Sequence, residues 1–323
     1  MRRLSTLLAI CVVTATMAAG CGEDDVEIVG GDDGAATTLT TALSRVSPVD
    51  GEPLWVYYDD SAALADLLAG REPVAESPRY EELVGFGAVS LAGGRERIGP
   101  MGIDLTAAEY AVTVGAPPHQ YALVAGGQDT ETLAAELTEH GWSAEGDELV
   151  APAPGQVDGD LAQYTLWLAK VAIDDGELVY GGAGADLSLV DGSDGGLMAD
   201  ARVASIAGCL GDVAAALINT PELPDVSPVL GLGVRTPADA DERPEVVVCT
   251  SWESEDAAAA YAERATGDLT DGSTPDGLPY SELFDPAEAV TDGDLASWRT
   301  GTDQAMTIFT VFARGGIPGL ALV

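Results

Sequence analysis

Basic side chains are scarce in this 323-residue sequence. It holds one lysine, Lys170, and thirteen arginines against 54 acidic residues, so its formal net charge is −40. A chain of this charge repels nucleic acid and anionic membrane surfaces and attracts cations. We therefore expect no nucleic-acid partner.

The motifs of common catalytic centres are missing as well. The sequence contains no G-x-S-x-G, no P-loop, no C-x-x-C and no H-E-x-x-H, and neither of its G-x-G pairs extends to G-x-G-x-x-G. These absences remove the usual signals of hydrolases, phosphate-binding loops, zinc sites and dinucleotide sites. We expect no cofactor, no metal centre and no catalytic residues, and we interpret the chain as a non-enzyme.

Histidine is nearly absent. His119 follows two prolines in a predicted turn, and His140 ends a predicted helix, where a cation complements the helix dipole. Neither stands beside a recognisable nucleophile, so we interpret His119 as an exposed loop residue and His140 as structural.

Carboxylate pairs are plentiful, but they carry little information in so acidic a chain. A glycosidase needs two carboxylates, so a secreted hydrolase acting through such a pair is an alternative function. The turn at 191–195 could hold calcium, although a solvated acidic turn is the simpler interpretation because no EF-hand spacing occurs. The pairs are Asp59 with Asp60, Asp174 with Asp175, Asp191 with Asp194, and Asp292 with Asp294.

No apolar run reaches the roughly 20 residues that span a bilayer. The run from Leu7 to Ala19 follows Arg2 and Arg3 and ends in small residues. This arrangement is typical of a secretory signal peptide rather than of a stable membrane span.

The end of this signal resembles a bacterial lipobox. Ala18, Ala19 and Gly20 lead directly into Cys21, although the position of Ala18 is usually Leu. We expect residues 1–20 to be a lipoprotein signal peptide and Cys21 to carry the lipid; ordinary secretion is the alternative. The predicted location is the outer face of the cell membrane, reached through a flexible acidic tether at residues 21–35.

Cysteine is otherwise limited to one pair in the predicted folded part. Cys209 and Cys249 would face an oxidising compartment, so we expect one disulfide; two buried free thiols are the alternative.

The folded part reads as two halves of similar order, β-α-β-β-α-β. We predict an α+β fold with two tandem ferredoxin-like domains, at 36–155 and 160–323, each an antiparallel sheet with both helices on one face. Helices are expected at 36–46, after Asp60, after Asp129, at 197–219 and after Ser254. Strands are expected at 54–58, 108–115, 120–125, 148–151, 167–173, 177–180, 229–235, 245–250, 296–300 and 305–312.

An internal duplication is predicted by two matching segments. Residues 121–141 (YALVAGGQDTETLAAELTEHG) and 245–267 (EVVVCTSWESEDAAAAYAERATG) share a strand, a short turn, an acidic cap and an amphipathic helix.

Three segments resemble uncharacterised actinobacterial lipoproteins: YALVAGGQDTETLAAELTEHGW, GIDLTAAEYAVTVG and LMADARVASIAGCLGDVAAALI. The resemblance implies an envelope location and a duplicated α+β architecture, and it transfers no activity and no site residue.

We therefore expect a membrane-anchored envelope lipoprotein that binds or scaffolds, with an unidentified envelope protein or small ligand as partner. A solute-binding lipoprotein is a further alternative. The five tryptophans could bind ligands, but packing is the simpler interpretation: Trp55, Trp142, Trp167, Trp252 and Trp298.

Overall fold

The computed structural model describes residues 36–69, 80–153, 156, 164–192, 194–221 and 228–321. The predicted signal peptide and the predicted tether, with Ala18, Ala19, Gly20 and Cys21, lie outside the described residues. The α-helices are α1 (Thr38–Arg45), α2 (Ser61–Leu68), α3 (Val89–Ala92), α4 (Arg95–Ile98), α5 (Thr130–Glu139), α6 (Ala201–Leu210), α7 (Glu255–Asp271) and α8 (Thr307–Ala313).

The 3-10 helices are η1 (Glu81–Leu83), η2 (Phe86–Ala88), η3 (Gly99–Met101), η5 (Leu187–Leu189), η6 (Gly196–Ala199) and η7 (Tyr280–Glu282). The strands are β1 (Trp55–Asp59), β2 (Tyr110–Val114), β3 (Tyr121–Ala125), β4 (Ser143–Glu145), β5 (Glu148–Val150), β6 (Lys170–Asp174), β7 (Glu177–Gly181), β8 (Val213–Asn219), β9 (Val229–Arg235), β10 (Glu245–Ser251), β11 (Val290–Asp292), β12 (Leu295–Gly301), β13 (Gly316–Ile317) and β14 (Leu320–Ala321).

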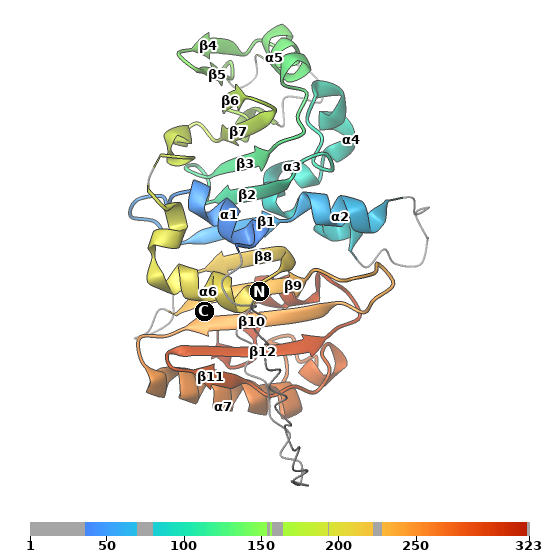
Figure 1. The fold of residues 1–323 in the computed structure, drawn as a ribbon, viewed down its shortest axis with the longest axis vertical. Helices are drawn as coiled ribbons and strands as arrows, with labels where there is room; N and C mark the ends of the chain where they lie inside the picture. The colour runs from blue at the N-terminus through green and yellow to red at the C-terminus, as the bar shows by residue number, and fades with distance from the viewer. Residues whose placement is uncertain are drawn as a thin grey trace, which may run out of the picture.

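One antiparallel sheet of twelve strands runs the length of the molecule (Figure 1). Its order is β11-β12-β10-β9-β8-β1-β2-β3-β7-β6-β5-β4, and β13 pairs with β14 in a separate small sheet. The protein is therefore an α+β protein with a large antiparallel sheet.

Two separate ferredoxin-like sheets are not confirmed, because strands from both predicted halves pair with one another. β6 pairs with β5, β7 pairs with β3, and β1 pairs with β8 in the register Tyr57 to Leu217. The ranges 36–155 and 160–323 thus share one sheet, and their division into two domains stays a prediction.

The helices lie on both faces of this sheet, whereas we expected them on one. α1 and α6 pack on one face with Val56, Leu123 and Val247. α5 and α7 pack on the other face, α5 with Val124 and α7 with Val248. The buried strands are apolar on both sides, so each face needs its own cover.

Three predicted helix starts are confirmed by their caps. The side chains of Asp60, Asp129 and Ser254 accept hydrogen bonds from the backbone N–H groups three residues onward, which closes the first turns of α2, α5 and α7.

The predicted helix at 197–219 is wrong in its second part. α6 ends at Leu210, because Gly211 adopts a φ of 64° and its N–H caps the carbonyl of Ala207. The chain then enters β8, which pairs with β1 and β9 and is buried along its whole length. A strand that is covered on both faces does not alternate between apolar and polar residues. The continuous apolar residues of β8 therefore fitted the helical spacing that begins in α6, and the sequence predicted one long helix.

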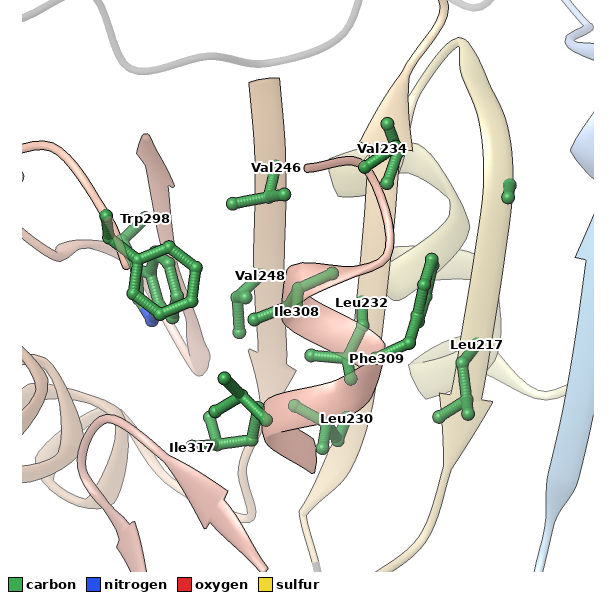
Figure 2. Packing of buried hydrophobic residues seen from close by; sticks show 14 of the residues in the cluster. Leu217, Leu230, Leu232, Val234, Val246, Val248, Trp298, Ile308, Phe309 and Ile317 are labelled. Carbon is green, nitrogen blue, oxygen red and sulfur yellow. The ribbon is translucent and has the colours of Figure 1, made fainter. Parts of the chain in front are cut away.

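The predicted strand at 305–312 is also wrong, because this segment forms α8. Ile308 and Phe309 of α8 lie over Leu230, Leu232 and Val248 of the sheet (Figure 2). The β-branched residues that suggested a strand here make contact with the sheet from a helix, where tertiary packing outweighs local propensity.

α6 lies unusually close to β9. A Cβ on Gly231 would lie 2.4 Å from Ile206 of α6, and one on Gly233 would lie 3.1 Å from Leu210 of α6. The predicted disulfide is present on this face: Cys209 of α6 bonds Cys249 of β10, with the two Cα atoms 6.2 Å apart. The bridge therefore ties the helix to the strand beneath it.

The predicted duplication corresponds to a repeated order of elements. If the helices between β1 and β2 (α2, α3 and α4, with η1, η2 and η3) are set aside, the order α1-β1-β2-β3-α5-β4-β5 in the first part matches α6-β8-β9-β10-α7-β11-β12 in the second. β1 and β8 meet antiparallel at the centre, and each repeat extends outward from there. The matching segments 121–141 and 245–267 are β3-α5 and β10-α7, which occupy equivalent places. The β6-β7 hairpin separates β3 from β5 and has no counterpart in the second repeat.

Candidate functional site

The most distinctive site in the described chain begins where η2 crosses the sheet. The buried carboxylate of Asp59 accepts hydrogen bonds from the Gly87 N–H at 2.7 Å and the Ser61 hydroxyl at 2.5 Å. The Thr113 hydroxyl donates to the Gly87 carbonyl. A Cβ on Gly87 would lie 2.0 Å from the carbonyl oxygen of Ala111, so glycine is required for this approach. The contacts fix η2 and the start of α3.

The chain continues into α3 and α4, which lie against the segment that leads into β6. Leu91 and Ile98 are buried and anchor the two short helices. Gly94 between them leaves room for the ring of Tyr164, since a Cβ there would lie 1.7 Å from the Tyr164 hydroxyl. A hollow of about 660 Å³ results, lined by α3, α4, Tyr164 and Trp167. We call it the donor hollow.

Hydrogen-bond donors line this hollow. Arg95 and Arg97 form no ion pair within the described residues. Tyr164 is only 5 % exposed, and its hydroxyl has no hydrogen-bond partner in the described chain. Trp167 adds an aromatic side chain to the lining, and Glu96 adds a carboxylate. The arrangement can hold an anion, with an aromatic ring beside it.

Two other arginines of the described chain each bind two acidic partners. Arg45 holds Glu177 at 2.7 Å and Asp191 at 2.6 Å. Arg243 pairs with both Asp285 and Asp303. Within the described residues Arg95 and Arg97 have no such partner; what sets them apart from Arg235, Arg264 and Arg299, which also form no ion pair there, is that both line one hollow.

A second hollow, of about 650 Å³, lies between α7 and the β13-β14 hairpin. Its charged groups hold the hairpin: Asp268 accepts from the Gly319 N–H at 2.8 Å, and Arg264 donates to the Gly319 carbonyl. Because these groups already have protein partners, the second hollow is the weaker candidate.

The two histidines lie apart from both hollows. His119 occupies the β2-β3 turn after the cis Pro117–Pro118 bond, and its Nδ1 lies 2.5 Å from Glu52. His140 caps α5 and lies 3.9 Å from Glu136. Both side chains are exposed, and both contact carboxylates.

The carboxylate pairs have separate structural roles. Asp59 is fully buried, and burial raises its pKa to about 7, yet it has no access to a substrate; Asp60 caps α2. Asp191 binds Arg45, which lowers the pKa of Asp191. The other pairs lie in or beside the β6-β7 and β11-β12 turns. In the described residues, no three side chains from His, Cys, Asp and Glu gather as a possible metal-ligand set.

The tryptophans divide between packing and the hollow. Trp142, Trp252 and Trp298 are buried, and their indole N–H groups donate to Leu168, Thr250 and Tyr261. Trp55 packs against Tyr57 and Phe312. Trp167 alone among the five lines the donor hollow.

Sequence reasoning missed this hollow. The sequence feature that could have indicated it is the Arg95-Glu96-Arg97 triplet. It places two of the few basic residues close together in an acidic chain. Tyr164 and Trp167 are distant in sequence, and only the folded sheet brings them to α3 and α4.

The fold and the hollow define an α+β protein with a large antiparallel sheet and a donor-lined surface cavity. No family model matches the chain, and no curated protein matches it. Among solved structures it is similar to the one described as "Structure of crystal form I of TP0453", with a TM-score of 0.42 and 10% identity, over 84% of this chain and 96% of that one. A likeness this slight has no bearing on function. Within the described residues, no helix has the length and apolar character of a membrane span.

Proposed function

We propose that this protein is a non-catalytic binding lipoprotein of the cell envelope and that its donor hollow takes an anionic ligand. The observation that carries the proposal is the pair Arg95 and Arg97, which shares a hollow with the Tyr164 hydroxyl and has no ion-pair partner in the described chain.

The charge balance supports an anionic ligand. A guanidinium forms short, strong hydrogen bonds with phosphate and carboxylate oxygens, often in a bidentate fork. In a chain of net charge −40, the arginines could have been neutralised by protein carboxylates, as Arg45 and Arg243 are. Because Arg95 and Arg97 have no ion pair within the described residues, their donors are available for a ligand.

The envelope location is supported by the sequence alone. The signal at 1–20, the lipobox residues Ala18, Ala19 and Gly20, and the acidic tether at 21–35 place Cys21 as the lipid-bearing residue. A Cys21→Ala variant is expected to leave the membrane fraction. A variant that still sediments with membranes would contradict lipid anchoring at this cysteine.

Ligand binding is tested by calorimetric titration with glycerol 1-phosphate, with glycerol as the uncharged comparison. We expect the phosphate to bind and glycerol not to bind. Replacing both Arg95 and Arg97 with alanine is expected to weaken binding at least about 100-fold, because two charge-assisted hydrogen bonds are lost and each contributes about 1.5–3 kcal/mol.

The matched control is Arg314→Ala, since Arg314 is an exposed arginine that faces Asp276 instead of the hollow. It is expected to bind glycerol 1-phosphate like the unaltered protein. Equal losses in both variants would show that general charge, and not the hollow, determines binding.

A further inference from the structure

The lining of the donor hollow is mostly polar. Small-molecule pockets of about 300–1,000 Å³ are usually lined by apolar and aromatic side chains. The donor hollow, at about 660 Å³, has this size, but its larger side chains are mainly polar: Ser90, Arg95, Glu96, Arg97 and Tyr164. A ligand that fills it therefore needs hydrogen-bonding groups over much of its surface.

The hollow offers hydrogen-bond acceptors as well as donors. Glu96 lies between Arg95 and Arg97 in the sequence of α4, yet its carboxylate forms no ion pair within the described residues. The Ser90 hydroxyl donates to the Tyr180 hydroxyl at 3.2 Å, which leaves the Ser90 oxygen able to accept. A small anion needs donors alone, and Glu96 would repel it. A ligand with hydroxyl groups beside its negative charge uses both kinds of group, because a hydroxyl donates and accepts.

The charged and uncharged groups lie at different depths. Tyr164 is 5 % exposed, and its hydroxyl lies against Gly94 without a hydrogen-bond partner in the described chain. Arg95 is half-buried, whereas Glu96 and Arg97 are exposed. A ligand that fits this order places an uncharged hydroxyl inward and its negative charge at the mouth of the hollow.

From this arrangement we infer that the ligand is an acidic saccharide, a pyranose ring that carries a carboxylate or a phosphate. Its charged group binds Arg95 and Arg97, and its hydroxyl groups bind Tyr164 and Glu96. The half-buried ring of Trp167 in the lining suits the C–H face of the sugar, because the face of an aromatic ring is negative. The inference rests on the proposed function and specifies the ligand of the same site.

The test compares ligands by calorimetric titration of the full chain. Glucose 6-phosphate and glycerol 1-phosphate carry the same phosphate and differ in the pyranose ring, and we expect the sugar phosphate to bind about tenfold more tightly. Glucose, which has the ring without the charge, is expected to bind at least about 100-fold more weakly than glucose 6-phosphate. Glucuronate carries a carboxylate in place of the phosphate, so the tighter of the two acidic sugars identifies the acid.

Glu96→Gln separates a saccharide from a simple anion. Glycerol 1-phosphate is expected to bind this variant at least as tightly, because the neutral amide does not repel phosphate. The advantage of glucose 6-phosphate over glycerol 1-phosphate is expected to fall about fivefold, because hydrogen bonds to a charged acceptor are stronger than those to a neutral one. The control is Glu263→Gln, an exposed glutamate of α7 outside the hollow, which is expected to change neither affinity.

Tyr164→Phe keeps the buried ring and removes only the hydroxyl. It is expected to weaken glucose 6-phosphate binding and to leave glycerol 1-phosphate binding unchanged. If neither acidic sugar binds more tightly than glycerol 1-phosphate, or if Glu96→Gln strengthens all three ligands equally, the saccharide assignment is overturned while anion binding stays intact. Absence of binding by all three would overturn the proposed function as well.

Discussion

The carboxyl group of Asp59 lies where η2 meets the sheet, and its hydrogen bonds stabilise that contact. It is wholly buried and accepts hydrogen bonds from Ser61 and Gly87. Burial raises its pKa to about 7, and the neighbouring Asp60 adds to the rise. η2 leads directly into α3, so this carboxyl supports the wall of the donor hollow.

Stability should depend on pH through Asp59. In the unfolded chain this carboxyl ionises near its ordinary pKa of 3.8, whereas the native protein holds the proton until about pH 7. The free energy of unfolding therefore falls as pH rises from about 4 to about 7, by up to about 4 kcal/mol from this group. In Asp59→Asn this fall is expected to disappear, as measured by urea denaturation across that range.

The comparison must be made between variants, because other carboxyl groups act in the opposite direction. Hydrogen bonds and Arg45 lower the pKa of Asp186 and Asp191, so their stabilising effect is lost as the pH falls. Asp174→Asn, at the exposed last residue of β6, serves as the control. If Asp59→Asn and Asp174→Asn show the same pH dependence, Asp59 does not titrate as described.

At the scale of elements, α6 is held on the sheet by packing and by one covalent bond. The disulfide from Cys209 to Cys249 spans 40 residues of sequence. It closes a loop that contains β8 and β9, the two strands between α6 and β10. In the chain-entropy account, such a bridge stabilises the native state by restricting the unfolded chain.

Removing the bridge should lower the free energy of unfolding by about 4 kcal/mol, given the loop of 40 residues. The double variant Cys209→Ala with Cys249→Ala and the chemically reduced protein are expected to agree in urea denaturation. If reduction leaves the unfolding midpoint unchanged, the bridge does not constrain the unfolded chain.

Local patterns predicted most elements, and the failures share a physical cause. Caps identified the starts of α2, α5 and α7, because a side-chain acceptor at a helix start is a local feature. β8 and α8 were misassigned because their secondary structure depends on the elements that pack against them. β8 is buried on both faces, and α8 is a β-branched segment packed on a sheet.

The candidate site was less predictable than the fold. The triplet at Arg95–Arg97 is visible in the sequence, but only the folded structure shows that these arginines form no ion pair within the described residues. The disulfide was predictable because only Cys209 and Cys249 remained to pair. The donor hollow could not be predicted without the order of the strands in the sheet, because the pairing of β6 with β5 brings Trp167 toward α4.

At the scale of the whole molecule, the two repeats meet through β1 and β8. This pairing is central in the sheet, and both strands are covered on both faces. Separating the repeats would expose the edges of two largely buried strands, at a cost in hydrogen bonds and apolar area.

The protein should therefore unfold in one transition rather than two. Differential scanning calorimetry is expected to give a single peak whose calorimetric and van't Hoff enthalpies agree. Two resolved transitions, assigned to residues 36–155 and 160–323, would support independent domains and contradict a shared core.

Anion binding at Arg95 and Arg97 is tested most directly by NMR of the arginine Nε–Hε groups during titration with glycerol 1-phosphate. Signals are assigned with Arg95→Lys and Arg97→Lys. We predict saturable shifts at Arg95 and Arg97 and none of comparable size at Arg299, which has no ion pair in the described chain and does not line the hollow. Absent or non-saturable shifts at Arg95 and Arg97, or equal shifts at Arg299, would contradict the donor hollow as the binding site.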